Sequence, residues 1–237
     1  MVTLIFFYIG PVQSINHKGN LQKQESLYCD YLNHLSMNSK FVVAIGYSEG
    51  GLQPLLTFFD HVPHDQATYI ILRHIPIDQR STLADILKRH SKLEIREAED
   101  GKPIENDVVY IPPSSSYLFI KDDQLYLQSR TAETRNYNFL IDTFLTSLAE
   151  AKGEKSIAVI LSGSGIDGAE GARQIKKSGG AVIVQDPASC ECPEMPERAI
   201  ETGCVCKILH PAEMPDFVTK YVHPILNNAN LAKRLTE

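Results

Sequence analysis

The chain has 237 residues, of which 43% are hydrophobic and 22% charged, and its 29 acidic and 23 basic side chains give a net charge of −6. This composition is typical of a globular protein and excludes collagen, disorder or a coiled coil for the whole chain. No cluster of Lys and Arg interrupts the acidic balance, so nucleic-acid binding is excluded as a leading function. The length suits one large α/β domain with a core of its own.

The first 40 residues show no sustained hydrophobic period apart from a short helical pattern near residues 25–35, and we predict an N-terminal tail or linker over 1–40. The longest apolar run, residues 2–9, is far shorter than the roughly 20 residues that a membrane span needs. It also lacks the basic start and cleavage site of a signal peptide, so we interpret it as a terminal strand or a disordered remnant. We therefore expect a cytoplasmic protein with no membrane insertion.

From residue 41 onward, apolar runs alternate with amphipathic segments. Strands are predicted over residues 41–45, 67–72, 93–98, 108–111, 157–161, 181–184 and 205–209. Helices are predicted over residues 52–62, 83–87, 139–151, 168–178, 195–202 and 211–222.

Residues 117–128 favour a β-hairpin with a polar turn at 121–124. The other strands are continuous Val/Ile/Leu runs separated by helices, which indicates a parallel sheet buried on both faces. The sequence therefore predicts one doubly wound, mostly parallel α/β domain over residues 41–225, with the hairpin as an antiparallel insertion. Residues 226–237 are predicted to be a C-terminal tail.

A G-x-S-x-G motif lies within Gly46-Tyr-Ser-Glu-Gly-Gly51, between the first predicted strand and the helix that follows. Its small residues permit a sharp turn that exposes the hydroxyl of Ser48. The N–H groups at the start of the following helix can stabilise an oxyanion there, so we include Glu49 and Gly50 in a predicted oxyanion site. A degenerate dinucleotide-binding loop and a plain tight turn are the alternatives.

A candidate general base, His74, directly follows the next buried strand. Because the carboxyl ends of parallel strands line one crevice, we expect His74 to meet Ser48 there. The alternative is a histidine that merely packs at the end of a strand.

A candidate orienting carboxylate, Asp167, follows a later strand in a glycine-rich loop. Such a group holds the imidazole in one tautomer and stabilises imidazolium. The alternative is that Asp167 caps the helix it precedes, since Asp is a preferred N-cap residue. The chain order Ser, His, Asp differs from the Ser, Asp, His order of α/β-hydrolases and disfavours that fold.

Together these motifs resemble the catalytic domain of the chemotaxis protein-glutamate methylesterases (CheB). The resemblance covers residues 41–220, and its motifs are Gly46-Tyr-Ser-Glu-Gly-Gly51, Arg73-His-Ile-Pro76, Leu161-Ser-Gly-Ser-Gly-Ile-Asp-Gly168, Glu97-Ala-Glu-Asp-Gly101, Val109-Tyr-Ile-Pro-Pro113, Gln185-Asp-Pro-Ala-Ser-Cys190 and Met195-Pro-Glu-Arg-Ala-Ile200. The Ser-Gly-x-Gly before the aspartate and Glu213-Met-Pro215 look most like methylesterase domains fused to receptor methyltransferases.

The resemblance implies hydrolysis of γ-glutamyl methyl esters on the cytoplasmic helices of methyl-accepting chemotaxis receptors, together with deamidation of particular receptor glutamines. Ser48 would be the nucleophile, His74 the proton carrier and Asp167 the residue that orients His74. Ser164 and Gly165 would lie beside the oxyanion site. No metal and no organic cofactor are implied.

The family commonly carries a receiver domain ahead of the esterase, and 40 residues cannot encode one. Activity would then be constitutive, or controlled by a separate regulatory or methyltransferase chain, or the sequence is a piece of a larger gene product.

Three residues depart from the family pattern. Glu49 replaces a small residue or threonine, and it would either repel the oxyanion and raise the pKa of His74 or face solvent. Ser164 stands where methionine is common. Arg73 replaces a common glutamine and would meet an acidic receptor surface or pair with an acid such as Glu49. An intact triad favours an active esterase, and the alternative is a weak or inactive module that binds a receptor or signalling partner.

Two further hypotheses concern other chemistry. A nucleotide-binding Rossmann domain would need an acidic residue after the second strand, where the sequence has Arg73 and His74. Two C-x-C pairs, Cys190/Cys192 and Cys204/Cys206, could together hold zinc, but structural zinc sites use wider spacing. For Cys204 and Cys206 the pattern favours small hydrophobes buried on one face of a strand.

Overall fold

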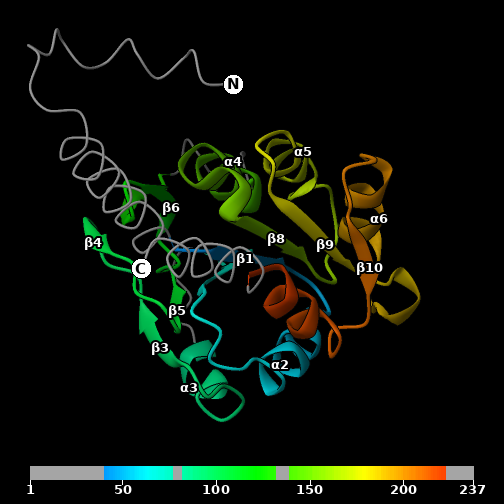
Figure 1. Ribbon diagram of the computed structural model, residues 1–237, viewed down its shortest axis with the longest axis horizontal. Helices are drawn as coiled ribbons and strands as arrows, with labels where there is room; N and C mark the ends of the chain where they lie inside the picture. Colours follow the sequence, from blue (N-terminus) through cyan, green and yellow to red (C-terminus); the bar gives the residue numbers. More distant parts are fainter. Residues whose placement is uncertain (1–39, 77–81, 132–138, 223–237) are drawn as a thin grey trace, which may run out of the picture. The chain divides into compact units, whose positions relative to one another are not determined.

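A computed structural model describes residues 40–76, 82–131 and 139–222, which lie within one compact unit, Lys40–Ile225 (Figure 1). The apolar run at residues 2–9, the helical pattern near 25–35 and the C-terminal tail lie outside the described residues. The predicted division of the chain near residues 40 and 225 therefore stays a prediction. Among the described residues, no helix is long and apolar enough to cross a membrane.

A seven-stranded parallel sheet forms the centre of the unit, in the order β10-β9-β8-β1-β2-β5-β3. Its strands, in that order, are Lys207–Leu209, Ala181–Gln185, Ser156–Ile160, Val42–Tyr47, Thr68–Arg73, Val108–Ile111 and Glu94–Glu97. The chain winds from β1 through β2 to one edge, and later from β8 through β9 to the other. The strand order therefore reverses between β1 and β8, and ligands of open α/β sheets bind at such a switch point. The predicted doubly wound α/β fold is confirmed.

Helices cover both faces of the sheet (Figure 1). The helices α4 (Leu140–Lys152), α5 (Ala169–Lys177) and α6 (Glu194–Glu201) lie on one face. On the other face lie α2 (Leu52–Asp60) and a helical segment over residues 214–222. Short elements complete the connections: α3 (Leu83–Leu87), η3 (Gly153–Lys155) and η4 (Pro187–Ser189).

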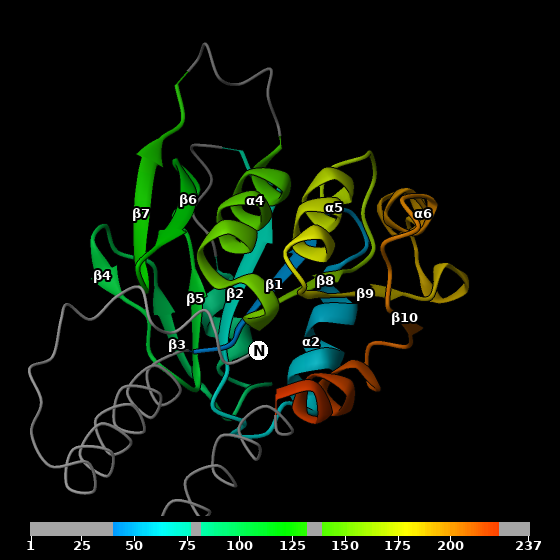
Figure 2. The same cartoon turned by 45° about the horizontal axis from the view of Figure 1, so that its top comes forward.

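The predicted hairpin is present as β6 (Ser116–Lys121) and β7 (Gln124–Ser129). Asp122 and Asp123 form its two-residue turn with φ of 50° and 60°, the left-handed conformation that such hairpin turns need. The hairpin does not extend the main sheet. It forms a separate three-stranded sheet with β4 (Lys102–Pro103), a strand that the sequence analysis missed, and it packs beside α4 (Figure 2).

The central strands are buried on both faces, which explains their continuous apolar runs. Because side chains alternate along a strand, Ala44 and Ile70 of β1 and β2 face the α4 side, where Phe144 is also buried. On the opposite face, Tyr69 makes edge contacts with Phe58 and Phe59 of α2.

The prediction for the last two cysteines was wrong. The final strand begins at Lys207, after both cysteines, and Cys206 is exposed while Cys204 is half-buried. These two cysteines are therefore not a buried pair on one face of a strand.

Candidate active site

The register of the parallel sheet places Ser48 and His74 at the same level. Tyr47 and Arg73, the last residues of β1 and β2, are register partners. Ser48 and His74 are the next residues on each chain, so both leave the sheet together at its carboxyl edge. Both residues thus lie at the predicted edge of the sheet, with Ser48 at the switch point, and the contact between Ser48 and His74 stays a prediction.

The other neighbour of Ser48 is the loop that follows β8. The backbone N–H of Ser48 donates to the carbonyl of Ser162 (3.0 Å), and that of Leu161 donates to Gly46 (2.9 Å). The hydroxyl of Ser162 is fully enclosed and accepts a hydrogen bond from the N–H of Cys192 (3.0 Å). The loop is thereby held between the Ser48 turn and the segment that leads into α6.

Two glycines let the chain turn sharply at Ser48. Gly50 has φ of +71°, a left-handed conformation that side chains disfavour. A Cβ on Gly51 would lie 2.6 Å from the carbonyl oxygen of Ser162 and 2.7 Å from the side chain of Tyr47. Gly50 is therefore favoured by its backbone conformation and Gly51 by a close backbone contact, and α2 begins immediately afterwards at Leu52.

The side chains of His74 and Asp167 are in direct contact. Nε2 of His74 lies 2.8 Å from Oδ2 of Asp167, with 16% of the His74 side chain and 4% of the Asp167 side chain exposed. This contact occupies Nε2, and Nδ1 is the other ring nitrogen that can accept or donate a proton.

Asp167 also caps a helix, but a different one from the helix considered in the sequence. Its Oδ2 accepts from the N–H of Ile141 (2.9 Å) and its Oδ1 from that of Asp142 (2.8 Å), both in the first turn of α4. The helix that follows Asp167, α5, begins at Ala169, and its N-cap residue Gly168, with φ of 98°, has no side chain of its own that could act as a cap. Two N–H donors and the positive end of α4 therefore stabilise the carboxylate that faces His74.

The four residues of the predicted oxyanion site have different surroundings. Glu49 and Ser164 are exposed. A Cβ on Gly50 would meet the side chain of Glu191, and the N–H of Gly165 donates to Oε2 of Glu194 (2.8 Å). The oxyanion role of these four residues stays a prediction.

Glu49 and Arg73, the two charged departures from the family pattern, have identifiable neighbours. The thiol of Cys192 has a raised pKa, firstly through desolvation and then through the negative charge of Glu49. Burial raises the pKa of the Tyr47 phenol, and the positive charge of Arg73 opposes that rise. Glu49 therefore faces the Cys192 segment, and Arg73 lies near Tyr47.

The sequence analysis missed two residues that hold the site. Arg130 donates through Nη1 to the carbonyls of Ile75 (3.0 Å) and Ser114 (2.8 Å), which ties the segment after His74 to the loop before β6. Asp142 donates to Asp167 through its backbone and contacts the start of α5 through its side chain. Neither residue belongs to a local motif, so only the tertiary structure reveals them.

The described cysteines are free thiols, and no group of three or more His, Cys, Asp or Glu residues in the described ranges could hold a metal ion. Burial, aided by the charge of Asp186, raises the pKa of Cys190 to about 11.

Comparisons with known proteins identify relatives of this chain. The family model for the CheB methylesterase matches residues 43–218. A protein-glutamate methylesterase/protein-glutamine glutaminase of Pyrococcus horikoshii is 30% identical over 205 residues, which are 85% of this chain and 56% of that protein. A protein of the same name from Thermotoga maritima is 29% identical over 231 residues, 93% of this chain and 67% of that protein.

A solved structure gives the same result for the fold. The crystal structure of the Thermotoga maritima CheB methylesterase catalytic domain matches with a TM-score of 0.71 and 31% identity, over 77% of this chain and 98% of that domain. The chain spans little more than half the length of the curated Pyrococcus relatives that it matches, 56% in each.

Proposed function

This chain belongs to the CheB methylesterase family, and we propose that it hydrolyses γ-glutamyl methyl esters on the cytoplasmic helices of methyl-accepting chemotaxis receptors. The relatives are named both methylesterase and glutaminase, so deamidation of receptor glutamines is part of the same proposal. The observation that carries the proposal is the 2.8 Å contact of His74 with a capped, nearly enclosed Asp167, where His74 follows the strand beside the one that leads to Ser48.

In the proposed reaction, the hydroxyl oxygen of Ser48 attacks the ester carbonyl while Nδ1 of His74 takes its proton. The tetrahedral intermediate collapses as His74 returns the proton to the departing methoxide, and methanol leaves. Water, deprotonated by His74, then attacks the γ-glutamyl ester of Ser48 and releases a glutamate carboxylate. Asp167 stabilises the imidazolium in both halves of the reaction. With a glutamine substrate, ammonia takes the place of methanol.

The proposed donors to the oxyanion are the backbone N–H groups of Glu49 and Gly50, in the turn that leads into α2. Such donors act in place, without reorganising as the charge develops. Ser164 and Gly165 are proposed to border the bound ester from the loop after β8. No cofactor takes part in this mechanism, which the side chains of the chain itself can complete.

A second candidate function is a weak or inactive module that binds a receptor or a signalling partner. The observation that favours it is the carboxylate of Glu194 on the N–H of Gly165, because that carboxylate occupies a donor which the esterase hypothesis assigned to the substrate. We further propose cytoplasmic residence, where the receptor helices lie. The control of activity by a separate regulatory or methyltransferase chain and the closer kinship to methyltransferase-fused domains stay proposals.

The test is methanol release from receptors carrying labelled methyl groups on their glutamates. We expect release by the native chain and a loss of at least about 10³-fold in Ser48→Ala. Binding of the receptor without any release would establish the binding module instead. Equal release by native protein and Ser48→Ala would overturn the assignment of the nucleophile.

A further inference from the structure

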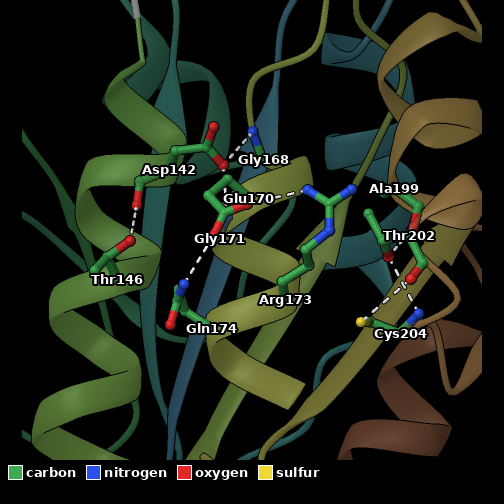
Figure 3. A network of polar contacts seen from close by, with 10 residues as sticks. All are labelled: Asp142, Thr146, Gly168, Glu170, Gly171, Arg173, Gln174, Ala199, Thr202 and Cys204. Atoms are coloured by element: carbon green, nitrogen blue, oxygen red, sulfur yellow. Dashed lines mark hydrogen bonds and ion pairs between the residues drawn. The ribbon is translucent and has the colours of Figure 1, made fainter. Parts of the chain in front are cut away.

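The first turns of α4 and α5 are joined by a reciprocal pair of aspartates. Asp142, in the first turn of α4, accepts hydrogen bonds at Oδ1 from the N–H of Gly168 (2.9 Å) and Gly171 (2.7 Å) at the start of α5 (Figure 3). Asp167, just before α5, accepts from the N–H of Ile141 and Asp142 at the start of α4. Each helix therefore receives its N-terminal cap from the aspartate beside the other helix.

This arrangement holds Asp167 from two directions. The backbone of Asp142 donates to Oδ1 of Asp167, which leaves Oδ2 for Ile141 and His74. The side chain of Asp142 binds Gly168, the next residue after Asp167. Asp142 thus determines both the rotation of the Asp167 carboxylate and the position of its backbone.

The loop that carries Asp167 needs such support. Gly165 and Gly168 on either side of Asp167 have φ of 90° and 98°, so the loop contains two residues with little intrinsic conformational preference. Close helix packing brings Asp142 within reach, because Gly171 lies against Leu145 of α4, where a Cβ would come within 2.5 Å. The hydroxyl of Thr146 also donates to the carbonyl of Asp142 (2.8 Å) and steadies that turn (Figure 3).

From this geometry we propose that Asp142 is a positioning residue of the reaction, which holds Asp167 in the orientation that His74 requires. The inference rests on the proposed function only in taking Asp167 as the orienting carboxylate. Asp142 contacts neither His74 nor the substrate in this account and acts through Asp167 alone. Its side chain contributes a hydrogen-bond acceptor, Oδ1, held at one fixed distance from the backbone of α4.

Three substitutions test whether Asp142 acts as a hydrogen-bond acceptor at a fixed position or through its negative charge. Asp142→Asn keeps an oxygen that can accept from Gly168 and Gly171 but removes the charge. Asp142→Glu keeps the charge and moves it by one methylene. Asp142→Ala removes both. Glu150→Ala, an exposed acid on the same helix, is the matched control.

The readout is the rate at which a fluorophosphonate modifies Ser48, measured against probe concentration to separate binding from reaction. We expect Asp142→Asn and Glu150→Ala to stay within about threefold of the native rate, and Asp142→Glu and Asp142→Ala to lose about 10- to 100-fold at saturating probe. The probe concentration that gives half the maximal rate should differ little between the native protein and the variants. A faster reaction of Ser48 in Asp142→Asn than in Asp142→Glu decides the question even if Asp142→Ala does not fold. A folded Asp142→Asn protein that reacts as slowly as Asp142→Glu would overturn the proposal.

Proton NMR of the His74 ring gives a second readout that needs no catalysis. We expect a downfield Nε2–H signal, shared with Asp167, in the native protein and Asp142→Asn, and its loss in Asp142→Glu. A retained signal in Asp142→Glu would contradict the positioning role. A native chain that releases no methanol but shows this pattern would refute the proposed function while leaving the role of Asp142 intact.

Discussion

Nε2 of His74 lies 2.8 Å from Oδ2 of Asp167, and the same oxygen accepts a hydrogen bond from the first turn of α4. One carboxylate therefore serves as the partner of the imidazole and as a helix cap. The helix end supplies positive potential beside the carboxylate that the proposed triad needs in its negatively charged form. The sequence offered capping of the following helix, α5, as the alternative to an orienting role for Asp167. In the structure Asp167 caps α4 instead and contacts His74 with the same carboxylate, while its catalytic role stays a proposal.

Replacing Asp167 tests this dual role. We expect Asp167→Asn to lower Ser48 reactivity by about 10³- to 10⁴-fold, because an amide can neither favour the required tautomer nor stabilise imidazolium. Asp167→Ala should additionally lower the free energy of unfolding by about 1–2 kcal/mol through loss of the α4 cap. Fluorophosphonate kinetics and urea denaturation measure the two effects.

The control for the two Asp167 variants is Asp186→Asn. Asp186 also caps a short helix, accepting from the N–H of Ala188 (3.0 Å), but it has no part in the proposed triad. Its substitution should leave Ser48 reactivity within about threefold of the native value. A native rate in Asp167→Asn would remove this aspartate from the mechanism.

Gly51→Ala should damage both stability and reactivity. The new Cβ would lie 2.6 Å from the carbonyl oxygen of Ser162, so backbone on one side must move. We expect a loss of about 2 kcal/mol or more in the free energy of unfolding and at least about a tenfold loss in Ser48 reactivity.

Gly101→Ala supplies the comparison, since its Cβ would meet no atom within 4 Å although its φ is +67°. That variant should lose only about 1 kcal/mol, the cost of the left-handed backbone, with Ser48 reactivity unchanged. Equal behaviour of the two alanine variants would mean that the Ser48 turn is looser than the structure indicates.

Asp142 makes stability depend on pH in a predictable direction. Burial, reinforced by the charge of Asp167, raises the pKa of Asp142 from 3.8 to about 6. Between these values the folded state binds more protons than the unfolded state, so the contribution of Asp142 to stability falls as pH rises from 4 to 6.

Asp142→Asn removes that titration. The free energy of unfolding of this variant, relative to the native protein, should therefore rise between pH 4 and pH 7, by ~1 kcal/mol after allowance for partial solvent screening. Urea denaturation of both proteins at each pH measures the difference. A difference that is constant with pH, or that falls, would contradict the raised pKa.

Glu49→Gln separates two roles for this unusual neighbour of the nucleophile. Its carboxylate contributes to the raised pKa of the Cys192 thiol, after desolvation. We expect Cys192 to be alkylated faster in the variant, as measured by peptide mass spectrometry. Ser48 reactivity should change by less than about threefold. A large gain in Ser48 reactivity with unchanged Cys192 alkylation would show that Glu49 acts on the oxyanion instead.

Much of the fold could be predicted because the central strands are buried on both faces and the helices have one apolar side. The strand before Ser48 and the strand before His74 illustrate this, since each is a largely apolar run that ends within two residues of the polar residue of interest. The two-residue strand Lys102–Pro103 escaped prediction because it is too short to show any period. Cys206 was misplaced because the last strand begins one residue later.

The supporting residues of the site could not be predicted for a different reason. Asp142 reaches Gly168 across 26 positions of sequence, and Arg130 reaches Ile75 across 55. Their roles depend on how α4 packs against α5 and where the hairpin joins the sheet, which no local pattern encodes. Ser48 and His74 differ because each directly follows a buried strand, and the rules of parallel sheets bring strand ends together.

The most direct test of the account is the intact mass of the protein after reaction with a fluorophosphonate at neutral pH, with Ser48→Ala alongside. We expect one adduct on the native chain and none on Ser48→Ala, because only a serine activated by a neighbouring base reacts readily with such a probe. A folded native chain that gains no adduct, or an adduct that persists in Ser48→Ala, would contradict the assignment of Ser48, His74 and Asp167 as a working triad.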